Sequence, residues 1–224
     1  MKAPEGISGT SHARVDKALY GLKQSGRVWY EKIDDKPLSL GFKKSESDHC
    51  IYIHPKNQLA TGVYVDDLVI CGRMTQQIVN IKKQLSMFFP IKDLGTIDII
   101  IGWKIIRNRA IRSLTISQSH YLLEKVQSFG LINAKPYTSP LDGYSGILPA
   151  RDNELFADES AYVSAIGSLG YAFNGTRPDI SYATSQIGRF NSAPTNRHWD
   201  TACRVLRYLH GTKDYGINYC FGPP

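Results

Sequence analysis

Two adjacent aspartates interrupt an apolar run in the first half of the chain. The run extends from Gly62 to Ile70 and is otherwise apolar, with Asp66 and Asp67 at its centre. On a continuous strand, neighbouring side chains point to opposite faces of the sheet, so two adjacent carboxylates converge only where the chain bends. The pattern therefore predicts two β-strands joined by a tight bend that carries both aspartates.

Converging carboxylates have a chemical requirement. Two such charges about 4 Å apart repel by roughly 4 kcal/mol at an effective dielectric constant near 20, or about three pKa units. The pair therefore needs a proton or a cation. Oxygen ligands of this kind select Mg²⁺ or Mn²⁺, and a pair of these ions supports phosphoryl transfer by activating a hydroxyl and stabilising the leaving oxygen. The alternative interpretation is an exposed acidic turn between strands.

The sequence up to residue 116 predicts a mixture of helices and strands. Apolar spacing indicates the helices, and β-branched runs separated by turn residues indicate the strands. The expected elements are a helix over Arg27 to Ile33 that Pro37 should end or kink, strands at 50–54, 59–65 and 68–71, a helix that Thr75 caps and Pro90 stops, and a hairpin of strands at 97–107 and 111–116.

Beyond residue 116 the pattern becomes helical. A short helix is expected between a cap at Ser117 or Ser119 and Gly130, followed by a proline-rich loop at about 135–158. Three helical stretches follow the loop. The second should open at Pro178, and the third should run from a cap at Thr195 to Gly211.

Charge and composition limit the possible partners. Lys and Arg total 27 against 20 for Asp and Glu, which gives a net charge of +7 and suits a polyanionic partner. No apolar run approaches the roughly 20 residues of a membrane helix, and the first residues lack the apolar core of a signal peptide. We therefore expect a soluble intracellular protein, not secreted, without a membrane partner.

The four cysteines are widely spaced, which disfavours a disulfide framework or a zinc knuckle.

Several motifs share one family resemblance. Tyr64-Val65-Asp66-Asp67 is similar to the polymerase signature of reverse transcriptases, and residues 18–24 resemble the hallmark of the copia class. The chain thus resembles a copia-type LTR retrotransposon reverse transcriptase, a piece of a Pol polyprotein, over nearly its whole length. Further matches in the family's order are Trp29-Tyr30, Leu40-Gly41-Phe42, Ser47-Asp48, Lys92-Asp93-Leu94-Gly95, Ser117-Gln118, Thr176-Arg177-Pro178-Asp179-Ile180, Leu206-Arg207-Tyr208-Leu209 and Gly211-Thr212.

This resemblance implies an α+β fold. Residues 1–116 would form a partial reverse-transcriptase palm, an antiparallel sheet with helices that carries the aspartate hairpin and a primer-grip-like hairpin. Residues 117–213 would form a helical thumb-like region. Residues 214–224 would begin the connection toward a ribonuclease H domain that the chain does not contain.

The resemblance also implies the role of the central motif. Asp66 and Asp67 would be the catalytic metal ligands for Mg²⁺ or Mn²⁺, with Tyr64 beside the template-primer. Gln24 would lie near the incoming deoxynucleoside triphosphate, and Lys23 or Arg27 would face phosphates. The alternative for these last residues is a helix start with a solvated basic face.

Two arginines extend the expected nucleic-acid contact. Arg204 and Arg207 lie three residues apart, away from the apolar stripe of their helix, and would face the backbone of an RNA or DNA template-primer. A solvated helix face is the alternative.

The family's site includes a third aspartate on a palm strand upstream of residues 1–6, and Asp16 lies too close to the residue 18–24 motif to be its equivalent. The hairpin edge that pairs with that strand should therefore be open.

We expect a fragment of an RNA-directed DNA polymerase that is inactive without the remainder of a Pol polyprotein. The alternatives are a non-catalytic nucleic-acid-binding remnant and a decayed transposon reading frame. Phosphatases whose aspartates lie two apart fit poorly, because these aspartates are adjacent.

Overall fold

The computed structural model describes residues 18, 19, 21–142, 147, 149, 154 and 158–220. The chain divides into two compact units, Met1–Gly95 and Thr96–Pro224. This division falls earlier than the boundary that the sequence predicts at 116/117, because the second hairpin belongs with the helices that follow it. Each unit contains one four-stranded antiparallel sheet, so the expected mixture of helices and antiparallel strands is confirmed. The palm and thumb assignments stay predictions.

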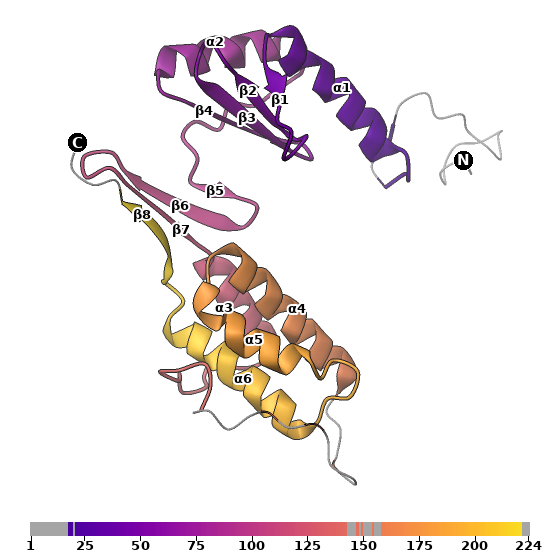
Figure 1. Cartoon of the computed structure of the whole chain (residues 1–224), viewed down its shortest axis with the longest axis vertical. Coiled ribbons are helices and arrows are strands. Elements are labelled where there is room, and N and C mark those ends of the chain that lie inside the picture. The colour runs from indigo at the N-terminus through magenta and orange to yellow at the C-terminus, as the bar shows by residue number, and fades with distance from the viewer. Residues whose placement is uncertain are drawn as a thin grey trace, which may run out of the picture. The chain divides into compact units, whose positions relative to one another are not determined.

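The first unit is a sheet with two helices on one face (Figure 1). Its strands follow chain order across the sheet, and every neighbouring pair is antiparallel. The β4 edge pairs with no further strand in the described chain. The elements are α1 (Ser25–Ser39), β1 (Lys43–Lys44), β2 (Ile51–His54), β3 (Leu59–Tyr64), β4 (Asp67–Gly72) and α2 (Thr75–Ser86).

Alternation along the strands decides which face of this sheet is covered. Leu59, Thr61 and Val63 alternate along β3 and are buried, and Ile81 and Leu85 of α2 join the same core. Side chains on the other face remain accessible. Ile51 and Ile53, for example, are 39% and 48% exposed. Tyr64 and Asp67 lie at the end of this open face.

A polar cluster fastens α1 to the first two strands. The Tyr52 hydroxyl donates to one oxygen of Asp34 at 2.6 Å, and the Lys44 ammonium donates to the other at 2.8 Å. Burial favours a higher pKa for Asp34, but the hydrogen bonds from Lys44 and Tyr52 outweigh it and lower that pKa. The carboxylate therefore stays charged and holds the helix in place.

Two details of these helices differ from expectation. Helix α1 passes through Pro37 and ends at Ser39, because a proline in the last turn removes a single helical hydrogen bond while its ring is buried. The N-cap of α2 is Met74 rather than Thr75, which is the first helical residue.

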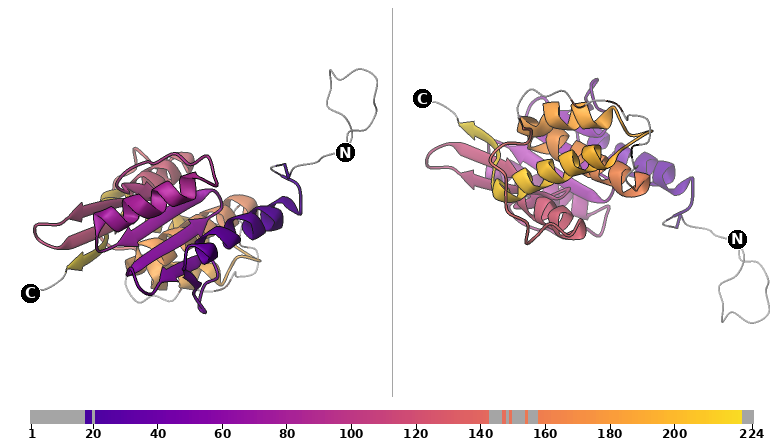
Figure 2. Two further views of the ribbon diagram at one scale, coloured as in Figure 1. Left: turned by 90° about the horizontal axis from the view of Figure 1, so that it is seen from above. Right: turned by 90° about the horizontal axis from the view of Figure 1, so that it is seen from below.

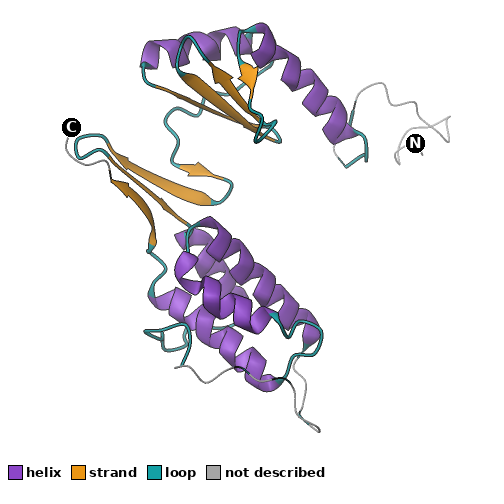
Figure 3. Ribbon diagram, in the orientation of Figure 1, coloured by secondary structure: helices purple, strands orange, loops and turns teal. Residues whose placement is uncertain are grey.

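The second unit joins a sheet to a helical bundle (Figure 3). The strands are β5 (Ile99–Ile100), β6 (Trp103–Asn108), β7 (Ser113–Ser117) and β8 (Gly216–Cys220), in that order across the sheet. The strand expected at 97–107 is broken at Ile101 and Gly102, which both have positive φ and turn the chain back. Strand β8 returns from the far end of the chain to pair with β7. The sequence did not predict β8.

The helices of this unit pack side by side around one core (Figure 2). Tyr162, Leu169, Ile187 and Leu206 are among its buried residues. The expected cap at Thr195 is confirmed, but the stretch expected to start at Pro178 begins with a 3₁₀ turn. The helices are α3 (Ser119–Ser128), α4 (Glu159–Gly175), the 3₁₀ turn η1 (Pro178–Ile180), α5 (Ser181–Gly188) and α6 (Asn196–Gly211). In the described part of the chain, no helix has the length and apolar character needed to cross a membrane.

Part of the expected loop at 135–158 lies outside the described residues, as do Asp16 and Tyr20.

Candidate functional site

The aspartate pair lies at the bend between β3 and β4, as the sequence predicts. Tyr64 pairs with Asp67 across the hairpin, so Val65 and Asp66 are the two central residues of the turn. Val65 has a φ of +53°, and Asp66 has a negative φ. A two-residue hairpin loop with positive φ at its first central residue has the pattern of a type II′ turn.

Both carboxylates of the turn face solvent. Asp66 and Asp67 are exposed, and Tyr64 beside them is 59% exposed. Because directly paired residues of an antiparallel ladder point to the same face, Tyr64 and Asp67 share the open face of the sheet. Within the described chain, no hydrogen bond or ion pair engages either carboxylate. The two adjacent carboxylates are therefore hydrated or available to a ligand.

Helix α1 is attached to this turn by a tryptophan. The Trp29 indole N–H donates to the backbone carbonyl of Val65 at 2.6 Å. The same ring packs edge-on against Phe89, with 6.0 Å between centroids. The sequence placed Trp29 in a helix and in a family match, but the spacing of a helix does not reveal a contact 36 residues away.

The residues expected to bind the nucleotide lie at the start of this helix. Gln24 is the N-cap of α1 and makes no side-chain capping bond, and Lys23 is exposed. Gln24 precedes Trp29, the residue of α1 that contacts the turn, by five residues, so the two positions are about 7.5 Å apart along the helix axis. Arg27 pairs with Glu31 at 2.7 Å, and the hydrogen bond and charge of Glu31 raise the pKa of Arg27. An exposed pair of this kind is weak enough to exchange for a phosphate contact.

The two arginines of α6 lie in the second unit and contact the segment between α3 and α4. The guanidinium groups of Arg204 and Arg207 lie 4.1 and 4.2 Å from the centre of the Tyr137 ring. Arg207 also donates to the carbonyl of Lys135 at 2.8 Å, and Arg204 lies 3.6 Å from Asp142. Both arginines thus hold the loop in this structure, and contact with a duplex stays a prediction for them.

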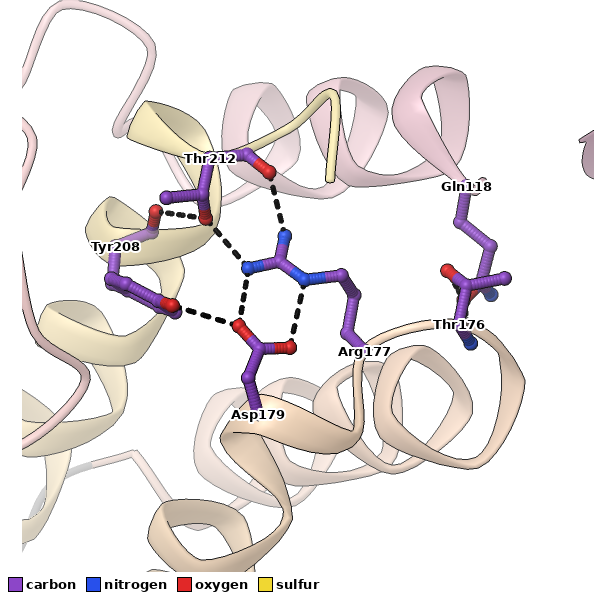
Figure 4. Close-up of polar contacts among 6 residues, drawn as sticks. All are labelled: Gln118, Thr176, Arg177, Asp179, Tyr208 and Thr212. Atoms are coloured by element: carbon purple, nitrogen blue, oxygen red, sulfur yellow. Dashed lines mark hydrogen bonds and ion pairs between the residues drawn. The ribbon is translucent and has the colours of Figure 1, made fainter. Parts of the chain in front are cut away.

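In the second unit, the motif Thr176 to Ile180 forms a polar network around the buried side chain of Arg177 (Figure 4). Arg177 is 1% exposed and donates to both oxygens of Asp179, at 2.9 and 2.7 Å. It also donates to the carbonyl and hydroxyl of Thr212, and the Tyr208 hydroxyl donates to Asp179. The network connects the end of α4 to the end of α6. Its polar groups are directed at one another, which is typical of a structural role.

A second buried contact lies beside it. The side-chain oxygen of Gln118 accepts from the backbone N–H of Thr176 at 3.0 Å and from its hydroxyl at 2.8 Å. Gln118 is fully buried, and the bond fixes the start of α3 against the end of α4. Two more residues of the recognised motifs therefore support the bundle.

The aspartate turn has the donor chemistry for a hard cation. Its two carboxylates supply oxygen ligands of the kind that Mg²⁺ and Mn²⁺ prefer, and Mg²⁺ usually retains waters or substrate phosphates besides one or two carboxylates. Among the described residues, no group of three or more His, Cys, Asp or Glu side chains is placed to hold a metal ion. Further ligands would therefore come from water, from substrate or from another segment.

Comparison with known proteins identifies relatives over almost the whole chain. It is 38% identical over 234 aligned residues to the retrovirus-related Pol polyprotein from transposon TNT 1-94 of Nicotiana tabacum, covering 99% of this chain and 18% of that protein. It is 37% identical to the Pol polyprotein from transposon RE1 of Arabidopsis thaliana, covering 91% of this chain and 14% of that protein. The chain thus spans less than a fifth of these polyproteins.

A shorter relative comes from yeast. The putative transposon Ty5-1 protein of Saccharomyces cerevisiae is 30% identical over 206 residues, covering 91% of this chain and 66% of that protein. No solved structure matches the chain. The family model for reverse transcriptase (RNA-dependent DNA polymerase) matches residues 1–143, which include the aspartate turn and all of the first unit. The chain therefore belongs to the reverse transcriptase family.

Proposed function

We propose that this chain is the part of a copia-type Pol polyprotein that carries two of the metal-binding carboxylates for RNA-directed DNA synthesis. The observation that carries the proposal is the turn itself. Its two adjacent residues Asp66 and Asp67 are both exposed and have no partner within the described chain, and Asp67 lies at the end of an open sheet face. Such a pair suits cation-assisted phosphoryl transfer better than it suits folding.

Each residue near the turn has a role in the proposed reaction. Asp66 and Asp67 would hold Mg²⁺ or Mn²⁺, which activates the primer hydroxyl and stabilises the leaving oxygen at the nucleotide's α-phosphate. Tyr64 lies on the same face as Asp67 and would contact the end of the template-primer. Gln24, at the exposed start of α1, would contact the deoxynucleoside triphosphate.

Basic residues would supply the remaining contacts. Lys23 and Arg27 flank Gln24 at the same helix start, and their exposed charges would meet phosphates. Arg204 and Arg207 would contact the duplex backbone only by giving up part of their contact with Tyr137. We expect them to contribute less than Lys23 and Arg27.

A non-catalytic nucleic-acid binder is the second candidate. It is favoured by the ligand count, because the described residues offer no group of three or more His, Cys, Asp or Glu side chains at the aspartate turn. Such a protein would bind template-primer with steep salt dependence and would incorporate no nucleotide.

Primer extension on an RNA template tests the proposal. The chain would be assayed with Mg²⁺ or Mn²⁺, both alone and joined to the upstream segment of the related TNT 1-94 polyprotein. In each form, Asp66→Asn and Asp67→Asn would be compared with Asp35→Asn, an exposed carboxylate of the same unit that serves as the matched control.

We expect extension by the joined form, its loss in Asp66→Asn and Asp67→Asn, and retention in Asp35→Asn. Extension that survives Asp66→Asn and Asp67→Asn would exclude these residues as metal ligands. Salt-sensitive template-primer binding with no extension in either form would favour the second candidate.

A further inference from the structure

The backbone of the aspartate turn has an unusual conformation. Val65 has a φ of +53°, in the left-handed region. This region is disfavoured for a β-branched residue, because its Cβ lies too close to the following carbonyl oxygen. The Val65 side chain is 57% exposed, so burial in the core contributes little to hold it there. The pairing of Tyr64 with Asp67 favours this φ, and a contact from outside the turn would add to it.

The Trp29 indole provides that contact. Its N–H reaches the carbonyl of Val65 itself, at 2.6 Å. The indole is in turn held by α1 and by its edge-on contact with Phe89, so the donor is fixed on both sides. The hydrogen bond acts on the peptide unit that joins Val65 to Asp66, and it thereby affects the direction in which the two carboxylates leave the turn.

We propose that Trp29 is a positioning residue that keeps Val65 in the left-handed conformation, so that Asp66 and Asp67 bind a divalent cation together. This inference rests on the proposed function of the turn. It assigns Trp29 a task that a core tryptophan does not have, since the indole N–H, and not only the ring, is needed.

Mn²⁺ binding to the full chain tests the proposal, because free Mn²⁺ is measured directly by electron paramagnetic resonance. Trp29→Phe removes the N–H and leaves an aromatic ring against Phe89. Trp103→Phe is the matched control, since the Trp103 indole nitrogen is buried without a hydrogen-bond partner in the described chain. We expect Trp29→Phe to weaken Mn²⁺ binding about two- to tenfold, the range of one hydrogen bond, and Trp103→Phe to leave it unchanged.

A rescue variant separates positioning from packing. Glycine adopts positive φ without the steric penalty of valine, so Val65→Gly in the Trp29→Phe chain should recover most of the lost affinity. A packing defect would not be rescued in this way. Unchanged affinity in Trp29→Phe, or a loss that Val65→Gly fails to recover, would overturn the proposal.

A second measurement distinguishes this proposal from the proposed function. Exchange of the Trp29 indole proton with solvent, followed by NMR, reports the hydrogen bond without any metal. Slow exchange supports the contact, and exchange as fast as in free tryptophan contradicts it. If the unaltered chain and its Asp66→Asn variant bind Mn²⁺ equally while the indole proton is protected, the metal-binding function fails and the contact with the turn stands.

Discussion

Charged side chains are exposed at the aspartate turn of the first unit and paired in the Arg177 cluster of the second unit. The Arg177 cluster consists of Arg177, Asp179, Tyr208 and Thr212. At the turn, two adjacent carboxylates are exposed and have no partner within the described chain. In the cluster, Arg177 is 1% exposed and binds Asp179 through two nitrogens and Thr212 through its carbonyl and hydroxyl. The sequence predicts a family motif at both sites, yet only in the cluster are the charges paired within the described chain.

The difference shows how to assign roles to charged residues of a family motif. A buried charge is tolerated when hydrogen bonds within the fold compensate its lost hydration, so such a residue stabilises the fold. A pair of like charges without a partner stabilises nothing in the folded chain. Stability measurements should therefore separate the two sites, and hydrogen exchange measures stability separately in each unit.

The largest loss of stability is expected for Arg177→Met. The substitution keeps much of the side-chain volume but leaves the Thr212 carbonyl without its Arg177 donor and Asp179 with only the Tyr208 hydroxyl as a side-chain donor. Breaking a buried ion pair costs about 3–5 kcal/mol, and we expect about 3 kcal/mol because the Asp179 side chain is 36% exposed and partly hydrated. Amide exchange in α4 and α6 measures the change.

The control for this substitution is Arg189→Met, at the residue that directly follows α5. Arg189 is exposed and reaches Gln186 at 3.3 Å, so its loss should change stability by less than about 0.5 kcal/mol. Equal effects of the two substitutions would mean that the Arg177 cluster does not stabilise the bundle.

Acid should weaken the second unit through Asp179. Burial favours a higher pKa, but the hydrogen bonds from Arg177 and Tyr208 and the charge of Arg177 outweigh it, so the pKa of Asp179 is lowered in the folded chain. A lowered pKa gives stability that is full above the unfolded value of about 3.9 and is lost as the pH falls through the folded value. The unfolding free energy should fall below about pH 4, by at most about 1.4 kcal/mol per pH unit for this group, and by less because solvent screens it.

The comparison variant for this pH dependence is Asp179→Asn. It should be less stable at pH 7 and should show a flatter decline of unfolding free energy as the pH falls below about 4. Parallel declines in both chains would assign the acid sensitivity to other carboxylates.

A smaller loss is expected for Tyr208→Phe. The hydroxyl donates to Asp179 at 2.8 Å, while the ring remains in the core cluster in either form. Loss of one hydrogen bond to a carboxylate that keeps both bonds from Arg177 should cost about 1 kcal/mol. Urea unfolding would measure it, and a cost as large as that of Arg177→Met would show that the hydroxyl, not the guanidinium, dominates the cluster.

The sequence predicted the features that depend on neighbouring residues. The bend at Asp66 and Asp67 followed from the strand period, and the cap at Thr195 followed from its position before an apolar stripe. Features that depend on distant partners were not predicted. Strand β8 exists because β7 offers it a ladder more than 90 residues earlier in the chain, and Gly216–Cys220 alone has no marked pattern.

The same limit applies to side chains. From the sequence, Arg177 and Trp29 are each one residue of a family motif. The structure shows that Arg177 binds Thr212, 35 residues away, and that Trp29 donates to the carbonyl of Val65. A sequence pattern identifies which residues occur together in a family. It does not say which of them point into the fold and which point out of it.

The smallest effect on stability is expected at the aspartates themselves. Asp66→Asn and Asp67→Asn remove charges that have no partner in the described chain, so each should change the unfolding free energy of the first unit by less than about 0.5 kcal/mol. Relief of repulsion between the two carboxylates even favours a slight gain at low salt. Amide exchange in β3 and β4 measures it, with Asp34→Asn as the contrast, because Asp34 holds Lys44 and Tyr52 and its loss should destabilise the unit.

If Asp66→Asn destabilised the unit as much as Asp34→Asn, the turn would be a structural element and the assignment of its charges to a cation would be wrong. Unchanged stability together with lost Mn²⁺ binding would show that these carboxylates serve a ligand and not the fold.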